Sequence, residues 1–241
     1  MYAALGSALA ERASDMESAV RLCAVVALSK LVSSEDPNDL EQSITEIVLN
    51  SLCLDPAASV YHFPLTKVCS LKFNKQFSEV RRAALLHIPL TPLTLPTILS
   101  RGRDVDPVVR KLLYSSVLLN KLKHPKHLTI TQREQVVKDG LGDRQESVRA
   151  AAGKVVEAWF NVIVSDSGED ASIVDGVVRF LQIFDVVGPG EGVGADALLS
   201  VFARRKDVLD DILFDGVFSI TLNEGGFLTG FGWRQTHSGV G

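Results

Sequence analysis

A short motif recurs along this chain and constrains its fold more than any other feature. In three copies an Asp precedes a Val-Arg pair by five positions: Asp15 with Val20-Arg21, Asp104 with Val109-Arg110, and Asp143 with Val148-Arg149. A partial copy, Val80-Arg81, has no Asp at that distance. Behind the last copy, apolar residues follow at helical spacing, at Val148, Ala151, Ala152, Val155 and Trp159. This spacing puts them on one face of a helix, and that face needs a partner.

Each part of the motif has a physical role at the start of a helix. The Asp carboxylate can accept hydrogen bonds from unpaired N–H groups and oppose the positive end of the helix dipole. The Arg follows the buried Val, so it can reach the Asp of its own or of a neighbouring repeat. Repeated amphipathic helices of this kind resemble HEAT repeats, in which stacked helix pairs share one continuous core. We therefore predict an all-α fold, a HEAT-repeat α-solenoid of antiparallel helix pairs, with HEAT repeats over residues 1–163.

The partial copy is repaired when one stretch of sequence is removed. Asp55-Pro56 has the residues of a helix start, but the stretch Ser59–Ser78 that follows has no apolar residues at helical spacing. Without these 20 residues Asp55 stands five positions before Val80, and the spacing from Val20 to Val80 falls from 60 to 40, close to the 39 between Val109 and Val148. We predict that residues 59–78 are an insert, such as a retained intron translated in frame. A natural surface loop is the alternative.

The remainder of the chain divides by composition. Thr131 and Glu134 have the spacing of a capping box, so a helix is expected to begin there. A polar linker is predicted at 164–170 and further helical repeats at 171–220. From Asn223 onward glycine is frequent and no amphipathic period survives, so residues 221–241 are expected to form a disordered or aberrant tail.

Composition and charge exclude several classes of protein. The chain has 241 residues, 46% of them apolar, and a net charge of −4, which gives no global signal for nucleic acid. Its three cysteines are odd in number and widely spaced, as expected for reduced thiols inside a cell. No signal peptide is expected. The apolar run from Leu85 to Leu99 is interrupted by prolines and is too short to cross a bilayer, so no membrane partner is predicted.

No catalytic, metal or cofactor site has support in the sequence. Gly190–Ala195 reads G-x-G-x-x-A, as in dinucleotide-binding folds, but no βαβ alternation surrounds it, and we favour a glycine-rich loop between helices. His124 and His127 are close together but have no further ligand near them. We therefore predict that the protein is not an enzyme, binds no small-molecule substrate and has no cofactor.

One segment carries a local positive charge. Between Arg101 and Lys138 there are nine Lys or Arg residues against three Asp or Glu residues, a local charge of +6. Such a strip on a solenoid could contact phosphates without reading bases. The candidate DNA-binding residues, chosen on charge alone, are Arg101, Arg103, Lys111, Lys121, Lys123, Lys126 and Arg133. The alternative is a solvated surface, with solvated lysines and with arginines used in pairs within a repeat, which applies most strongly to Arg110.

Several segments together resemble the G-type HEAT subunits of condensin, the condensin subunit 3 family, especially its fungal forms. The segments are Arg101–Leu112, Leu128–Glu134, Gly140–Arg144 with Val148-Arg149, and Asp196–Phe202. The resemblance extends over roughly Ala4–Ser219 apart from residues 59–78. The tail after Ser219 departs from the family pattern, as a frame or splice error would. Since the family subunit is several times longer, the resemblance implies that this chain is a fragment or a mis-predicted gene product.

The resemblance also implies a function. Subunits of this family bind the kleisin subunit and, with it, hold duplex DNA without sequence specificity in mitotic chromosome condensation. Kleisin, other condensin subunits and duplex DNA are therefore the expected partners, and nucleus and chromosome the expected location, with a cytoplasmic pool allowed. The alternative is a HEAT-repeat protein-protein adaptor with no nucleic-acid role.

Overall fold

The structure is a computed structural model. It describes residues 2–31, 44–53, 78–166, 172–188, 190–214, 218–222 and 228–233. Apart from Ser78, the predicted insert at 59–78 lies outside the described residues, as do most of the predicted linker and much of the predicted tail. Ser78 itself is helical and 2% exposed, so this last residue of the predicted insert belongs to the folded repeat.

The chain divides into two compact units. The first comprises residues 1–123 and 138–155, and the second comprises residues 124–137 and 156–241. This division lies inside the predicted repeat region 1–163, and helix α9 continues to Ser165, past the predicted start of the linker at 164.

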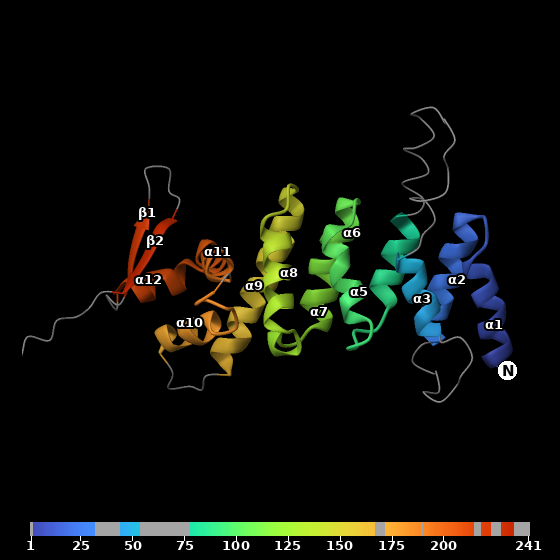
Figure 1. The fold of residues 1–241 in the computed structure, drawn as a ribbon, viewed down its shortest axis with the longest axis horizontal. Coiled ribbons are helices and arrows are strands. Elements are labelled where there is room, and N and C mark those ends of the chain that lie inside the picture. Colours follow the sequence, from blue (N-terminus) through green and yellow to red (C-terminus); the bar gives the residue numbers. More distant parts are fainter. Residues whose placement is uncertain are drawn as a thin grey trace, which may run out of the picture. The chain divides into compact units, whose positions relative to one another are not determined.

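The first unit consists of paired helices that lie side by side (Figure 1). They are α1 (Tyr2–Ala13), α2 (Ser18–Leu31), α3 (Ile44–Cys53), helical residues 78–87, α5 (Leu95–Ser100) with the 3₁₀ turn η3 (Arg101–Arg103), and α6 (Pro107–Leu112). Helix α6 continues through the π-helical segment η4 (Leu113–Leu118) into α7 (Leu119–Lys121). Helices α8 (Ile130–Leu141) and α9 (Glu146–Ser165) contribute to both units.

The motif valines lie at the start of the second helix of each pair. Val109 and Val148 are fully buried and Val80 is 2% exposed, whereas Val20 is only half-buried. Apart from a β-hairpin near the end of the described residues, this arrangement confirms the predicted all-α repeat architecture. The repeats share their core because no single helix pair could bury these positions alone.

The second unit contains the 3₁₀ turn η5 (Pro125–His127) and three further helices. These are α10 (Ile173–Leu181), α11 (Glu191–Arg204) and α12 (Lys206–Phe214). Its core includes a row of three aromatic rings. The ring centroid of Phe180 lies 5.4 Å from that of Phe160 and 5.5 Å from that of Phe184, and both contacts are edge-to-face.

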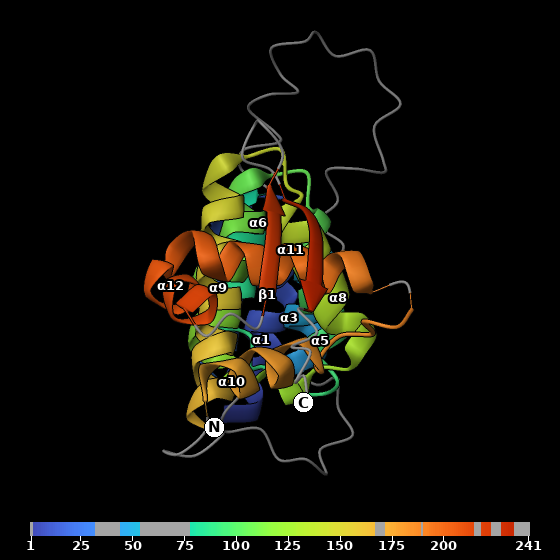
Figure 2. The ribbon, with the colours of Figure 1, turned by 90° about the vertical axis from the view of Figure 1, so that its left-hand side faces the viewer.

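A β-hairpin covers part of the predicted disordered or aberrant tail and also residues 218–220, where further helical repeats were expected. Strands β1 (Phe218–Leu222) and β2 (Leu228–Trp233) pair antiparallel, as Figure 2 shows. The expectation of disorder from 221 onward therefore does not hold for residues 221–222 and 228–233. The segment is rich in aromatic, Ile and Thr residues that favour strands, and the frequent glycines obscured this signal.

The predicted capping box of α8 is shifted by two residues. Thr129, rather than Thr131, provides the cap: its hydroxyl accepts from the Gln132 N–H at 3.2 Å, and the Gln132 side chain accepts from the Thr129 N–H at 2.9 Å. Both pairs have the spacing of a capping box, and the geometry selects the earlier one. Glu134 has a different role, described below.

Candidate functional site

The turn before each second helix is shaped by the motif Asp. Its carboxylate accepts from the backbone N–H two residues later, at 3.0 Å for Asp15, 2.9 Å for Asp104 and 2.7 Å for Asp143. The first residue of the helix follows the residue that donates this N–H: it is Ser18, Pro107 or Glu146 in the three copies. The Asp therefore stands just ahead of the helix and fixes the turn that leads into it.

The motif Arg turns back to the same Asp. Its Nη1 donates to the Asp carbonyl oxygen, at 2.8 Å from Arg21 to Asp15, 2.8 Å from Arg110 to Asp104 and 2.7 Å from Arg149 to Asp143. Each guanidinium is thereby held in one orientation relative to its own turn.

The rest of the guanidinium reaches the next repeat. Arg81 Nε and Nη2 donate to the two carboxylate oxygens of Asp104 at 3.1 and 3.2 Å. Arg110 uses the same two atoms on Asp143, at 2.6 and 3.0 Å. All four side chains are at most 9% exposed. We call these two bidentate pairs the ladder, and each pair a rung.

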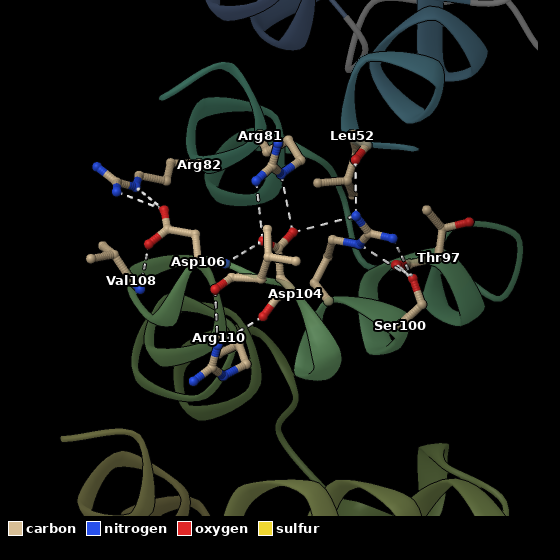
Figure 3. Close-up of polar contacts among 11 residues, drawn as sticks. Leu52, Arg81, Arg82, Thr97, Ser100, Asp104, Asp106, Val108 and Arg110 are labelled. Carbon is tan, nitrogen blue, oxygen red and sulfur yellow. Dashed lines mark hydrogen bonds and ion pairs between the residues drawn. The ribbon is translucent and has the colours of Figure 1, made fainter. Parts of the chain in front are cut away.

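Asp104 is the centre of the first rung, and Figure 3 shows it facing Arg81 beside Asp106 and Arg82. Arg101 adds a contact of 3.4 Å to its carboxylate. Next to it Arg82 pairs with Asp106 at 2.6 Å, a rung-like pair that the sequence motif did not reveal. Asp106 in turn accepts from the Val108 N–H at 3.0 Å and so caps α6.

Two carboxylates of this network, those of Asp143 and Asp106, are held in their charged form. The hydrogen bond from Arg110 lowers the pKa of Asp143 and outweighs the opposing effect of burial. Burial alone would raise the pKa of Asp106, but hydrogen bonds from the Val108 N–H, Arg82 and Ser78 offset it, and the net shift is downward. The bond to Asp106 is a reason for the burial of Ser78.

Four of the seven candidate DNA-binding residues already have partners. Arg101 contacts Asp104 and donates to the Leu52 carbonyl at 3.3 Å. Lys121 Nζ donates to the carbonyls of Leu86 and Ile88, at 2.7 and 2.8 Å. Its pKa is lowered by burial.

The other two of these four differ in exposure. Arg133 donates to the carbonyls of Leu128 at 3.1 Å and Ile183 at 2.6 Å, and it is half-buried. Arg103 pairs with Asp139 at 3.1 Å but is 68% exposed, so its charge still faces solvent.

The remaining three candidates are free to meet a ligand. Lys111, Lys123 and Lys126 are exposed, and their side chains form no ion pair or hydrogen bond within the described ranges. Lys138, which contributes to the same positive segment, is exposed as well. The sequence alone gave these lysines the same weight as Lys121, because only tertiary contacts separate them.

The glycine motif at 190–195 serves packing between helices. Gly190 precedes α11, and Gly192 and Gly194 lie within its first turn rather than in a loop. A side chain at Gly190 would collide with the Glu134 carboxylate, which accepts from the Asp185 N–H at 2.8 Å. Glu134 thus places a negative charge where the dinucleotide interpretation requires a phosphate, which argues against that interpretation.

His124 also has a local role. Its Nδ1 accepts from the Lys126 N–H at 2.9 Å, and its Nε2 lies 3.1 Å from Asp166. Among the described residues no cluster of three or more His, Cys, Asp or Glu side chains could hold a metal ion. In the same part of the chain, no helix is both long enough and apolar enough to span a membrane.

Comparison with known proteins gives consistent relatives. The chain is 35% identical to condensin complex subunit 3 of Schizosaccharomyces pombe over 92% of its own length, 30% identical to that of Saccharomyces cerevisiae over 86%, and 31% identical to that of Homo sapiens over 76%. It covers only 22%, 18% and 17% of these proteins. No family model matches the chain.

A solved structure agrees with these relatives. The fold matches a chain of the crystal structure of the S. pombe condensin Cnd3–Cnd2 subcomplex with a TM-score of 0.65 and 33% sequence identity. The match covers 87% of this chain and 24% of that one.

Proposed function

The chain is a relative of condensin complex subunit 3 that spans about a fifth of the length of the curated relatives it matches, and we propose that it is part of a non-enzymatic condensin subunit. In this proposal it binds a kleisin segment and duplex DNA during mitotic chromosome condensation. It acts in the nucleus and on the chromosome, with a cytoplasmic pool allowed.

One observation carries the proposal of a condensin role. The sequence comparison and the structure comparison point to the same subunit over nearly the whole chain. The S. pombe sequence is 35% identical over 92% of this chain, and the solved structure is 33% identical over 87% of it. The matched structure is a Cnd3–Cnd2 subcomplex. Cnd2 is the kleisin of that subcomplex, so the match supports kleisin binding by the present chain.

The proposal of DNA binding has separate support. Lys111, Lys123 and Lys126 present unpaired cations within a segment of charge +6. Cations that contact phosphates supply sequence-independent affinity, as a subunit that holds duplex DNA of any sequence requires. Arg101, Lys121 and Arg133 are weaker candidates because they already bind carbonyl or carboxylate groups within the fold.

The test is duplex binding by fluorescence anisotropy across a salt series, with and without a kleisin segment. Replacing Lys111, Lys123 and Lys126 by Glu is expected to abolish binding at moderate salt. Replacement by Gln should reduce the slope of log K against log salt by about 0.9 for each lost phosphate contact.

A charge-matched control uses three exposed lysines outside this segment, Lys30, Lys154 and Lys206. Their replacement by Gln changes the net charge equally, so an equal loss would mean that the effect is only one of total charge. If the folded chain with kleisin does not bind the duplex even at low salt, the proposal of DNA binding fails.

The alternative, a protein-protein adaptor without a nucleic-acid role, is favoured by the number of cations that the fold already uses. An apolar peptide groove should bind its partner with little dependence on salt, whereas phosphate contacts give a steep one. Binding of the kleisin segment alone, with no duplex bound in either assay, would support this alternative.

A further inference from the structure

The geometry of the ladder points to Arg149 as a binding site for a carboxylate side chain in an acidic segment of a partner protein. This inference rests on the contacts of the first unit and does not depend on the proposed function.

Arg149 is anchored to its own turn in the same way as Arg110, the arginine of the second rung. Its Nη1 donates to the carbonyl oxygen of Asp143 at 2.7 Å, just as the Nη1 of Arg110 donates to that of Asp104 at 2.8 Å. The position in the motif is also the same, directly after a fully buried Val. This anchoring presets the guanidinium and so reduces the entropy that a ligand must offset on binding.

In each rung the Arg Nε and Nη2 atoms bind a carboxylate, whereas the same two atoms of Arg149 bind no carboxylate among the described residues. In the rungs, Nε and Nη2 of Arg81 and Arg110 hold Asp104 and Asp143 with four contacts of 2.6 to 3.2 Å. Arg149 is exposed, and within the described residues of the first unit no carboxylate pairs with it.

The nearby acidic residues do not fill this position. Asp143 is already taken by Arg110. Glu146, which lies three positions before Arg149, forms no ion pair with it in the described structure. Among the residues that the structure describes, Arg149 is therefore the last arginine of the ladder and has no rung partner.

The surroundings favour an acidic segment that also carries an apolar residue. Arg144 is exposed and lies close enough to Asp143 to act on its charge. On the other side of the second rung Arg110 contacts the Val105 carbonyl at 3.4 Å, and Val105 is 70% exposed. A second cation and an exposed apolar residue are thus both linked to the second rung, Arg144 through Asp143 and Val105 through Arg110.

The rungs also favour a carboxylate over a phosphate diester as the ligand. The fork of Nε and Nη2 fits the two oxygens of one carboxylate, and in both rungs this chain uses it for Asp. A duplex would have to add contacts from other cations, and its binding would then show a steep dependence on salt.

The experiment follows the arginine Nε–H signals of the full chain by NMR with ¹⁵N-labelled arginine. The probe is a peptide of alternating Asp and Leu, and the reference peptide has Asn in place of Asp. We expect the Arg149 signal to shift in a saturable way with the Asp peptide only. Arg149→Gln should weaken binding about fivefold, whereas Arg179→Gln, which removes another exposed arginine, should leave it unchanged.

Four results would overturn the inference. The Asn peptide could shift the Arg149 signal as much as the Asp peptide does, or the signal could stay unmoved at millimolar peptide. The signal of the free chain could already show a paired, slowly exchanging guanidinium, which would mean that a carboxylate of the chain itself fills the site. A short duplex could shift it more strongly than the peptide at equal ionic strength, which would assign the site to nucleic acid instead.

Discussion

The second rung should be a major source of stability in the first unit, and its loss can be measured. Asp143→Asn keeps an oxygen to accept from the Gln145 N–H but removes the charge that faces Arg110. Both side chains are 6% exposed, so the remaining guanidinium would be buried without a counter-charge. Breaking a buried pair in this way costs about 3 to 5 kcal/mol. For a chain of this size that corresponds to a fall in Tm of roughly 10 °C.

The assay is urea unfolding followed by circular dichroism, with the midpoint and the slope m fitted for each variant. Arg110→Met should cost a similar amount. The double variant should cost less than the sum of the two single variants by about 2 to 3 kcal/mol, because it leaves no unpaired charge. Arg103→Gln is the matched control, since Arg103 also pairs with an Asp but is 68% exposed, and its loss should cost at most about 1 kcal/mol.

The reasoning is refuted if Asp143→Asn and Arg103→Gln prove equally mild. Additive costs in the double variant would likewise show that the two charges do not depend on each other. In either case the ladder would be an arrangement of surface charges rather than a joint between repeats.

Three further outcomes follow from the same structure. Because the folded-state pKa of Asp143 lies below its ordinary value of 3.8, its contribution is fully present above that value and is lost as the pH falls through the folded pKa, so urea midpoints should drop on acidification below about pH 4. Gly140→Ala would place a methyl group 2.5 Å from a neighbouring side chain and should cost about 1 to 3 kcal/mol, measured by thermal unfolding. Two deletions of 20 residues, 58–77 and 59–78, restore the same Asp-to-Val spacing, but only the first keeps Ser78 and its hydrogen bond to Asp106. The protein that lacks 58–77 should therefore be the more stable of the two by about 1 kcal/mol.

Each of these has a control. Asp143→Asn should flatten the acid response; an unchanged response would assign it to other carboxylates. Gly192→Ala meets nothing within 4 Å and lies in a helix, so it should be neutral or stabilising where Gly140→Ala is not. If both deletions unfold the chain relative to the full sequence, residues 59–78 are a required part of the fold and the insert hypothesis is wrong.

Local signals in the sequence were sufficient for the repeat architecture. The recurrence of Asp and Val-Arg at one spacing placed the turn and the start of each second helix, because capping and helical periodicity depend on residues close together in the chain. They were insufficient where two local solutions compete. Thr129 and Thr131 both fit a capping box, and only the packed helix selects Thr129.

The use of each cation could not be read from composition. Lys121 and Lys123 stand two positions apart in one positive segment, yet Lys121 binds the carbonyls of Leu86 and Ile88, more than 30 residues away, while Lys123 is exposed. Arg82 was not singled out because it and its partner Asp106 both lie outside the repeated positions of the motif.

By itself the sequence determined that this chain forms stacked helix pairs, since a periodic apolar face requires a neighbour whatever that neighbour is. It also determined which Asp and Arg residues mark the turns. Only the tertiary structure decided that the arginines of one repeat hold the aspartates of the next, that Arg149 has no rung partner among the described residues, and which lysines stay available to a ligand. Ion pairs and exposure depend on which surfaces meet across repeats, and that register is fixed by packing between helices far apart in the sequence.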